Sequence, residues 1–113
     1  MKITKEKLTP TELKEMSGRI FGNMVKAVVD VERGLLAVDA ELHSDLEALL
    51  IQEGSKQANL WGINLYPEAP GADLVEFDSM INLRPSQGNR SRGVESQDTR
   101  QRVLAVVQKW VRS

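Results

Sequence analysis

Arginine and asparagine side chains are concentrated in one segment of the C-terminal third of the chain. Guanidinium groups form paired hydrogen bonds with phosphate and carboxylate oxygens, and a glycine-containing loop that leads to a helix N-terminus adds backbone donors for an anion. The segment therefore predicts a site for an anionic ligand or partner, formed by Asn82, Arg84, Asn89, Arg90 and Arg92.

These arginines have a second interpretation. Residues 28–78 carry 11 acidic and 2 basic side chains, so the arginines can instead pair with carboxylates of the same chain. The segment lacks the spacing of a phosphate-binding P-loop. Aromatic residues make up only 4% of the chain, which disfavours base stacking on a sheet. Ligand binding and internal pairing both stay open.

The single histidine, His43, is the basis of a second candidate site. Imidazole titrates near neutrality and suits acid–base catalysis. Together with Glu41 and Asp78, His43 forms a candidate catalytic set, with metal assistance as one version of it. One histidine beside a predicted helix start is more often a capping or salt-bridging residue. We therefore predict no bound metal and no cofactor.

Hydrophobic periodicity and capping signals predict seven elements. Thr9 and Glu12 form a capping-box pattern before the first helix, and Ser44 with Glu47 forms another before the second. Apolar runs on either side of Gly34 predict a β-hairpin. The expected elements are a helix over 10–21, strands over 25–31 and 35–40, a helix from Ser44 to near Gly54, strands over 60–66 and 74–84, and a helix after Ser96 or Asp98.

This order, α-β-β-α-β-β-α, predicts an α+β fold in a single domain, residues 1–113. The two hairpins form a four-stranded antiparallel sheet, and the three helices pack mainly on its apolar face. The other face is mixed and includes Asn64 and Asn82, although asparagine is a poor strand former. Residues that break a local rule are often functional, so this face is either solvated or the floor of a binding site.

Composition narrows the class of protein. The chain has 113 residues and no cysteine, which excludes a disulfide scaffold, thiolate metal sites and a cysteine nucleophile. No apolar run approaches the length of a membrane span, and no signal peptide is evident. We therefore expect a soluble, cytoplasmic protein without membrane contact.

The formal net charge of −1 conceals a segregation of charge along the chain. Residues 1–27 carry six basic and three acidic side chains, a balance of +3, and residues 79–113 carry seven basic and two acidic ones, a balance of +5. The middle segment has a balance of −9. A generally basic nucleic-acid binder is excluded, whereas a local arginine site or a bipolar surface is not.

Several runs of sequence resemble a known family. They are ELHSD at 41–45, GSKQ at 54–57, NLWGIN at 59–64 and EFDSMINLRPSQGNRS at 76–91. The chain resembles, over nearly all of its length, a family of small uncharacterised bacterial proteins that is frequent in cyanobacteria. The resemblance implies a cytoplasmic bacterial protein of unknown function. It implies no activity, cofactor or catalytic residue.

Three hypotheses about function follow. The leading one is a binding module that recognises an anionic small molecule or nucleic acid through the Arg/Asn-rich loop. The alternative is a small enzyme that uses His43 with nearby carboxylates. A further alternative is a regulatory or toxin–antitoxin component that binds a protein partner or associates with itself through a strand edge or the last helix.

Overall fold

The computed structural model describes residues 1–69 and 71–112. Its α-helices are α1 (Pro10–Arg19), α2 (His43–Gln52) and α3 (Gln97–Trp110). Its strands are β1 (Lys2–Ile3), β2 (Val25–Asp30), β3 (Leu35–Val38), β4 (Leu60–Leu65) and β5 (Val75–Glu76). Short 3-10 helices are η1 (Gln57–Asn59), η2 (Gly71–Leu74), η3 (Met80–Asn82) and η4 (Pro85–Gln87). None of the helices in the described ranges is both long and apolar enough to cross a membrane.

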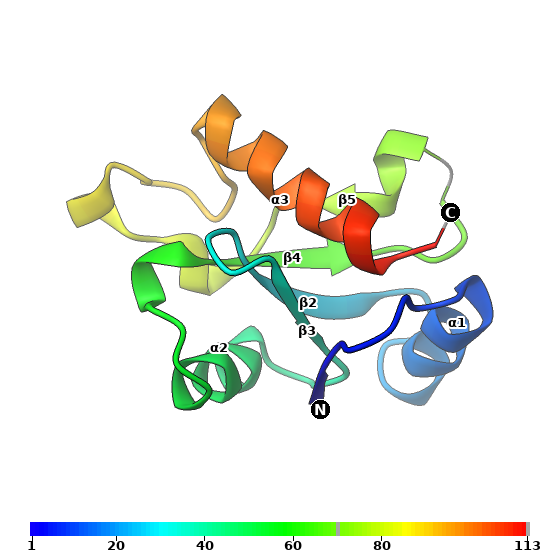
Figure 1. Ribbon diagram of the computed structural model, residues 1–113. Coiled ribbons are helices and arrows are strands. Elements are labelled where there is room, and N and C mark those ends of the chain that lie inside the picture. The colour runs from blue at the N-terminus through cyan, green and yellow to red at the C-terminus, as the bar shows by residue number, and fades with distance from the viewer. Residues whose placement is uncertain (70, 113) are drawn as a thin grey trace.

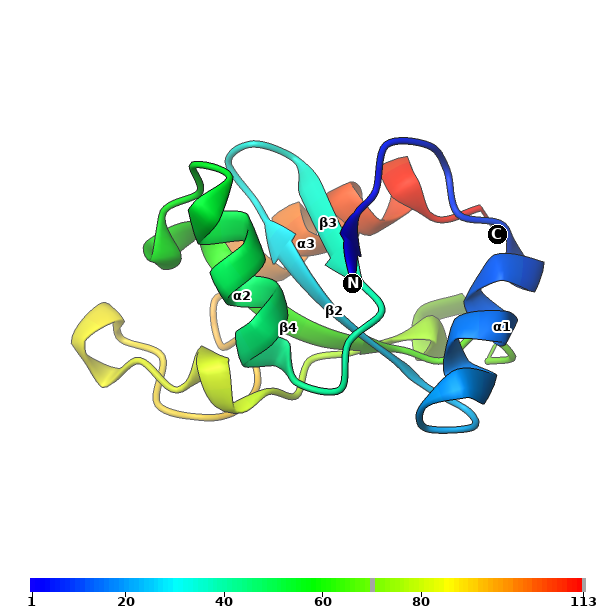
Figure 2. The ribbon, with the colours of Figure 1, turned by 90° about the horizontal axis from the view of Figure 1, so that it is seen from below.

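The strands form one antiparallel sheet in the order β1-β3-β2-β4-β5. Its centre is β2, where Val28 lies opposite Ala37 of β3 and Gly62 of β4. Gly34 has a φ of 67° in the turn between β2 and β3, a backbone conformation that favours glycine. Figure 2 shows β1, β3 and β2 side by side, with α2 in front of the part of the sheet that includes β4.

Helices cover both faces of the sheet because β2 is apolar on both sides. Ala27 and Val29 belong to a core that includes Val103 and Val107 of α3. Val28 points the other way, into a second core that it shares with four buried neighbours, Ala37, Leu46, Leu50 and Leu60. Figure 1 accordingly shows α3 on one side of the sheet and α2 on the other.

The α+β class with three α-helices and antiparallel pairing is confirmed, but the predicted architecture is wrong in two respects. The sheet has five strands instead of four, because the N-terminal Lys2–Ile3 pairs with the outer edge of β3. The helices α1 and α3 contribute to the core on the apolar face, but α2 packs on the mixed face instead of joining them. The mixed face is only partly open, since α2 and the segment after β5 pack on it and bury Asp30, Asn64 and Asn82.

The predicted strand over 74–84 is also wrong beyond Glu76. After β5 the chain turns through η3 and η4 instead of extending the sheet. Ser79 lies directly over Gly62 of β4, where a side-chain Cβ would come within 2.5 Å of the Ser79 Cβ. Glycine at this position therefore lets the segment after β5 pack on the sheet, and that segment forms one wall of the candidate site.

Candidate functional site

Asn82, the first residue of the predicted anion-binding loop, is fully buried and binds backbone groups. The Gly62 N–H donates to Asn82 Oδ1 at 2.8 Å. Asn82 Nδ2 donates to Gly62 O and to Arg92 O, both at 2.9 Å. The side chain thus fastens the loop to the middle of β4, with both donors and its acceptor used within the chain.

Asn89, which follows η4, also binds backbone groups of the loop with its side chain. Its Nδ2 donates to Asn82 O at 2.7 Å and to Gly93 O at 2.8 Å, and its Oδ1 accepts the Glu95 N–H. The Glu95 carboxylate in turn accepts the backbone N–H groups of Arg90 and Ser91. Backbone donors that suit an external anion are therefore occupied by the chain's own carboxylate.

Arg84 is buried against β4 and the segment that precedes it. Its guanidinium lies 4.1 Å from the centre of a Trp61 ring and donates to Gln57 O at 2.7 Å and to Leu60 O. Burial lowers the pKa of Arg84 from its usual value. These contacts hold the loop against η1 and leave only Nε without a partner among the described residues.

The last two arginines of the loop lie in different places. Arg90 is exposed. Arg92 reaches Asp78, with Nε 2.8 Å from the carboxylate Oδ1, in a half-exposed ion pair. Its two Nη groups make no hydrogen bond with the described residues. Of the five predicted anion-binding side chains, Arg90 and Arg92 thus keep guanidinium donors available to a ligand.

His43 is the first residue of α2 and is buried. Its Nε2 lies 2.8 Å from Ile63 O, and because a carbonyl only accepts, Nε2 carries the proton. Burial, together with the nearby charge of Lys26, lowers the pKa of His43 against the opposing effects of Ile63, Asp78 and Asn64. The ring is therefore neutral at pH 7, and its Nδ1 is an acceptor.

The N-terminus of α2 has no side-chain cap. The helix begins one residue before the predicted Ser44 cap, and Leu42 occupies the N-cap position. Leu42 has no side-chain oxygen, so the Ser44 amide lacks the acceptor that an N-cap side chain would supply, whereas the Asp45 N–H donates to Leu42 O at 3.2 Å. The His43 amide, the first of the helix, has no intrahelical partner either. Unoccupied amides and the helix dipole favour an anion at this point.

A cavity of about 450 Å³ opens at this helix end, and we call it the α2 cavity. It brings together His43, Asp78 and Arg92, which the sequence placed in two separate candidate sites. Glu41 is exposed and is not part of the wall. The complete lining is Met24, Lys26, Leu42, His43, Ser44, Asn64, Tyr66, Glu76, Asp78, Ser79, Met80, Ile81 and Arg92.

Two polar residues of the wall, Asn64 and Glu76, lie on the mixed sheet face, for which the sequence left a solvated surface and the floor of a binding site as alternatives. Asn64 is 5% exposed, and its Nδ2 donates to Glu76 Oε1 at 2.9 Å and to Asp78 O at 3.2 Å. Its Oδ1 is buried and has no hydrogen-bond partner among the described residues. The only indication of a role for Asn64 in the sequence was that asparagine is a poor strand former.

Lys26 and Tyr66 complete the polar wall. Lys26 Nζ lies 5.1 Å from the centre of the Phe21 ring and forms no ion pair with the described part of the chain. The Tyr66 hydroxyl donates to Glu76 Oε1 at 2.9 Å, and this hydrogen bond raises the pKa of Tyr66. Both side chains line the cavity at the α2 N-terminus, and they come from different segments, Lys26 from β2 and Tyr66 from the position directly after β4.

The described residues contain no group of three or more carboxylate or imidazole side chains placed to hold a metal ion. The cavity wall itself supplies two carboxylates and one imidazole whose Nε2 already donates to a carbonyl.

A family model described as "Protein of unknown function (DUF5674)" matches residues 2–110 of the chain. The chain belongs to this family. The match agrees with the resemblance to small uncharacterised proteins, and it assigns the family no activity, ligand or source. Neither the search of curated proteins nor the search of solved structures found a match. Bacterial origin, cytoplasmic location and self-association stay predictions.

Proposed function

We propose that this protein is a binding module for a small anion, which it holds in the α2 cavity. The observation that carries the proposal is the uncapped N-terminus of α2, which opens into a cavity that Lys26 and Arg92 also line. Free amides, a helix dipole and two cations together form a strong environment for phosphate or carboxylate oxygens. Of the loop residues predicted to bind an anion, only Arg92 takes part in this proposed site. Its partners are Lys26 of β2 and the backbone N–H groups at the start of α2.

The two carboxylates of the wall do not oppose an anion as free charges. Asp78 is paired with Arg92, and Glu76 Oε1 accepts hydrogen bonds from Asn64 and Tyr66. Lys26 is the cation without a carboxylate partner in the described residues. An anion at the helix end therefore meets one unpaired ammonium, the outer edge of a guanidinium and backbone N–H groups.

Two further features describe the ligand. The rim carries two apolar side chains, Leu42 and Met80, which are 54% and 64% exposed. A volume of about 450 Å³ suits a small molecule better than a nucleic-acid strand. We therefore expect a small organic phosphate with an apolar group.

The test is a calorimetric titration with inorganic phosphate and with phenyl phosphate at low and high salt. We expect saturable binding that weakens with salt, tighter for phenyl phosphate because its ring contacts the rim. Arg92→Gln should weaken binding severalfold. Arg90→Gln is the matched control, because it removes the same charge two residues away from a side chain outside the cavity. Absence of binding at low salt, or equal effects of the two variants, overturns the proposal.

The alternative, an enzyme that uses His43, is favoured by one observation. His43 and Asp78 line the same cavity, and the lowered pKa keeps the ring neutral and able to accept a proton. The contact of Nε2 with Ile63 O leaves only Nδ1 for such a step. Hydrolysis of phenyl phosphate that is lost in His43→Gln, while binding is retained, would support catalysis over simple binding.

A further inference from the structure

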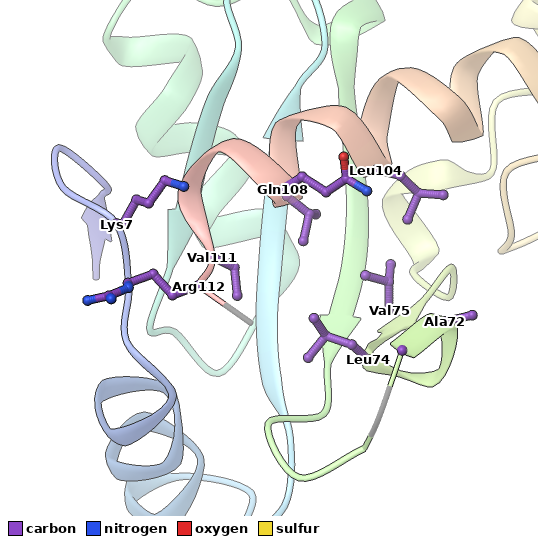
Figure 3. A pocket seen from close by; sticks show the side chains of 10 residues that line it. Lys7, Ala72, Leu74, Val75, Leu104, Gln108, Val111 and Arg112 are labelled. Atoms are coloured by element: carbon purple, nitrogen blue, oxygen red, sulfur yellow. The ribbon is translucent and has the colours of Figure 1, made fainter.

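An apolar groove lies on the other side of the sheet from the α2 cavity, between α3 and the η2–β5 segment. It has a volume of about 700 Å³. Figure 3 shows Leu104 and Val111 on the side of α3 that faces Leu74 and Val75. Val107 contributes to the floor, and the exposed Gln108 is the one amide side chain in the lining. The groove is thus a mainly aliphatic surface of a size typical for small-molecule sites.

The charged residues that line this groove are both cations, and they lie at the same end of it. Among the described residues, its lining includes Lys7 and Arg112 and no carboxylate. Neither cation forms an ion pair with the described part of the chain. Figure 3 shows both at one end of the groove, where the chain leaves α3.

The backbone fixes that end, although its residues are far apart in sequence. Leu8 pairs with Val111 in a parallel bridge. The Leu8 N–H donates to Trp110 O at 2.7 Å, and the Arg112 N–H donates to Leu8 O at 2.9 Å. Lys7 precedes Leu8 and Arg112 follows Val111, so the two cations flank this bridge, one on each of its two chain segments. Both side chains are exposed.

We propose that this groove binds a single-chain amphiphilic anion, a carboxylate on a short unbranched alkyl chain. The alkyl chain lies on Leu74, Val75 and Leu104, and the carboxylate stays at the mouth beside Lys7 and Arg112. Burial of apolar carbons gives the affinity, and the two cations select the sign of the head group. A second copy of this chain fits less well, because it would have to supply a carboxylate next to an aliphatic ridge.

The test uses NMR titration of the whole chain with octanoate, with octylammonium and acetate as matched probes. Octanoate should shift the amide signals of the C-terminal half of α3, whereas octylammonium lacks the correct charge and acetate lacks the chain. Equal binding of octanoate and octylammonium would show a groove without charge selection and overturn the proposal. Binding to anionic vesicles without any octanoate binding would assign the surface to a membrane and overturn it too.

Two isosteric substitutions on α3 sharpen the test. Gln108→Glu places a carboxylate in the groove, and Gln101→Glu makes the same change of charge at an exposed position outside it. We expect Gln108→Glu to weaken octanoate binding by about fivefold or more, the scale of one like charge near a protein surface. Gln101→Glu should leave it unchanged. The double variant Lys7→Gln, Arg112→Gln should remove the preference for octanoate over octylammonium, and retention of the preference contradicts the proposal.

Discussion

Replacement of Asn82 separates a structural from a ligand-binding role for the loop. Asn82→Ala removes three hydrogen bonds, two to Gly62 and one to Arg92 O, from a side chain that is fully buried. At about 1 kcal/mol for each bond, with more for backbone groups left unpaired, the loss is about 3–5 kcal/mol. That is a large part of the stability of a domain, about 5–15 kcal/mol.

Urea denaturation followed by circular dichroism measures this loss directly. Asn82→Asp is a second variant that keeps the shape and Oδ1 but lacks both amide hydrogens, so it should also destabilise strongly. Asn23→Ala, at an exposed asparagine, is the control and should change the free energy of unfolding by less than about 0.5 kcal/mol. If Asn82→Ala retains wild-type stability and loses phosphate binding, the side chain contacts a ligand and our account of the loop is refuted.

Three further predictions concern the surroundings of the cavity. Gly62→Ala should destabilise the fold by about 1–3 kcal/mol, because the new Cβ comes within 2.5 Å of the Ser79 Cβ; a thermal melt equal to wild type would contradict this packing. Burial lowers the pKa of His43 in the folded state, so the unfolded chain binds the proton first and the wild type should lose stability as pH falls below about 6.5. His43→Gln should show less of this loss between pH 7.5 and 5, and parallel pH curves for the two proteins would exclude it. Arg84→Gln should lower the free energy of unfolding by about 2–3 kcal/mol, because charge-assisted hydrogen bonds are lost together with the contact to Trp61. A change below about 0.5 kcal/mol in chemical denaturation would be inconsistent with this structural role of Arg84.

Local signals in the sequence predicted two local features correctly, although the equally local capping pattern at Ser44 failed. The Thr9 capping box forms as predicted, with the Glu12 N–H donating to Thr9 Oγ1 and the Thr9 N–H donating to the Glu12 carboxylate. The hairpin of β2 and β3 turns at Gly34, as its glycine and flanking apolar runs predict. Both depend on contacts between residues only a few positions apart.

The alternating segment 74–84 misled because its alternation has another cause. Polar side chains in it and in β4 bind backbone groups that strand pairing would otherwise use: Asn64 binds Asp78 O, and Asn82 binds Gly62. Such side-chain bonds compete with strand pairing. The asparagines that fit poorly in a strand therefore do mark unusual positions. They form hydrogen bonds within the chain, and Asn64 also lines the candidate site.

The candidate site was predictable in its residue types and not in its grouping. His43, Asp78 and Arg92 were all singled out, yet no pattern indicated that the helix end and the loop share a cavity. Their meeting depends on α2 packing over Val28, a contact between segments distant in the sequence. The two-residue strand β1 was missed for the same reason, since it is too short to show a period and is defined by its pairing with β3.

An NMR titration of the isotope-labelled protein with inorganic phosphate tests the central claim most directly, because it reports which amides meet the anion. Our account predicts that the largest shifts fall on the His43 and Ser44 amides at the start of α2, with smaller ones around Arg92. Shifts centred on the amides of Arg90 and Ser91, which already donate to Glu95, would contradict it. So would an absence of saturable shifts at low salt.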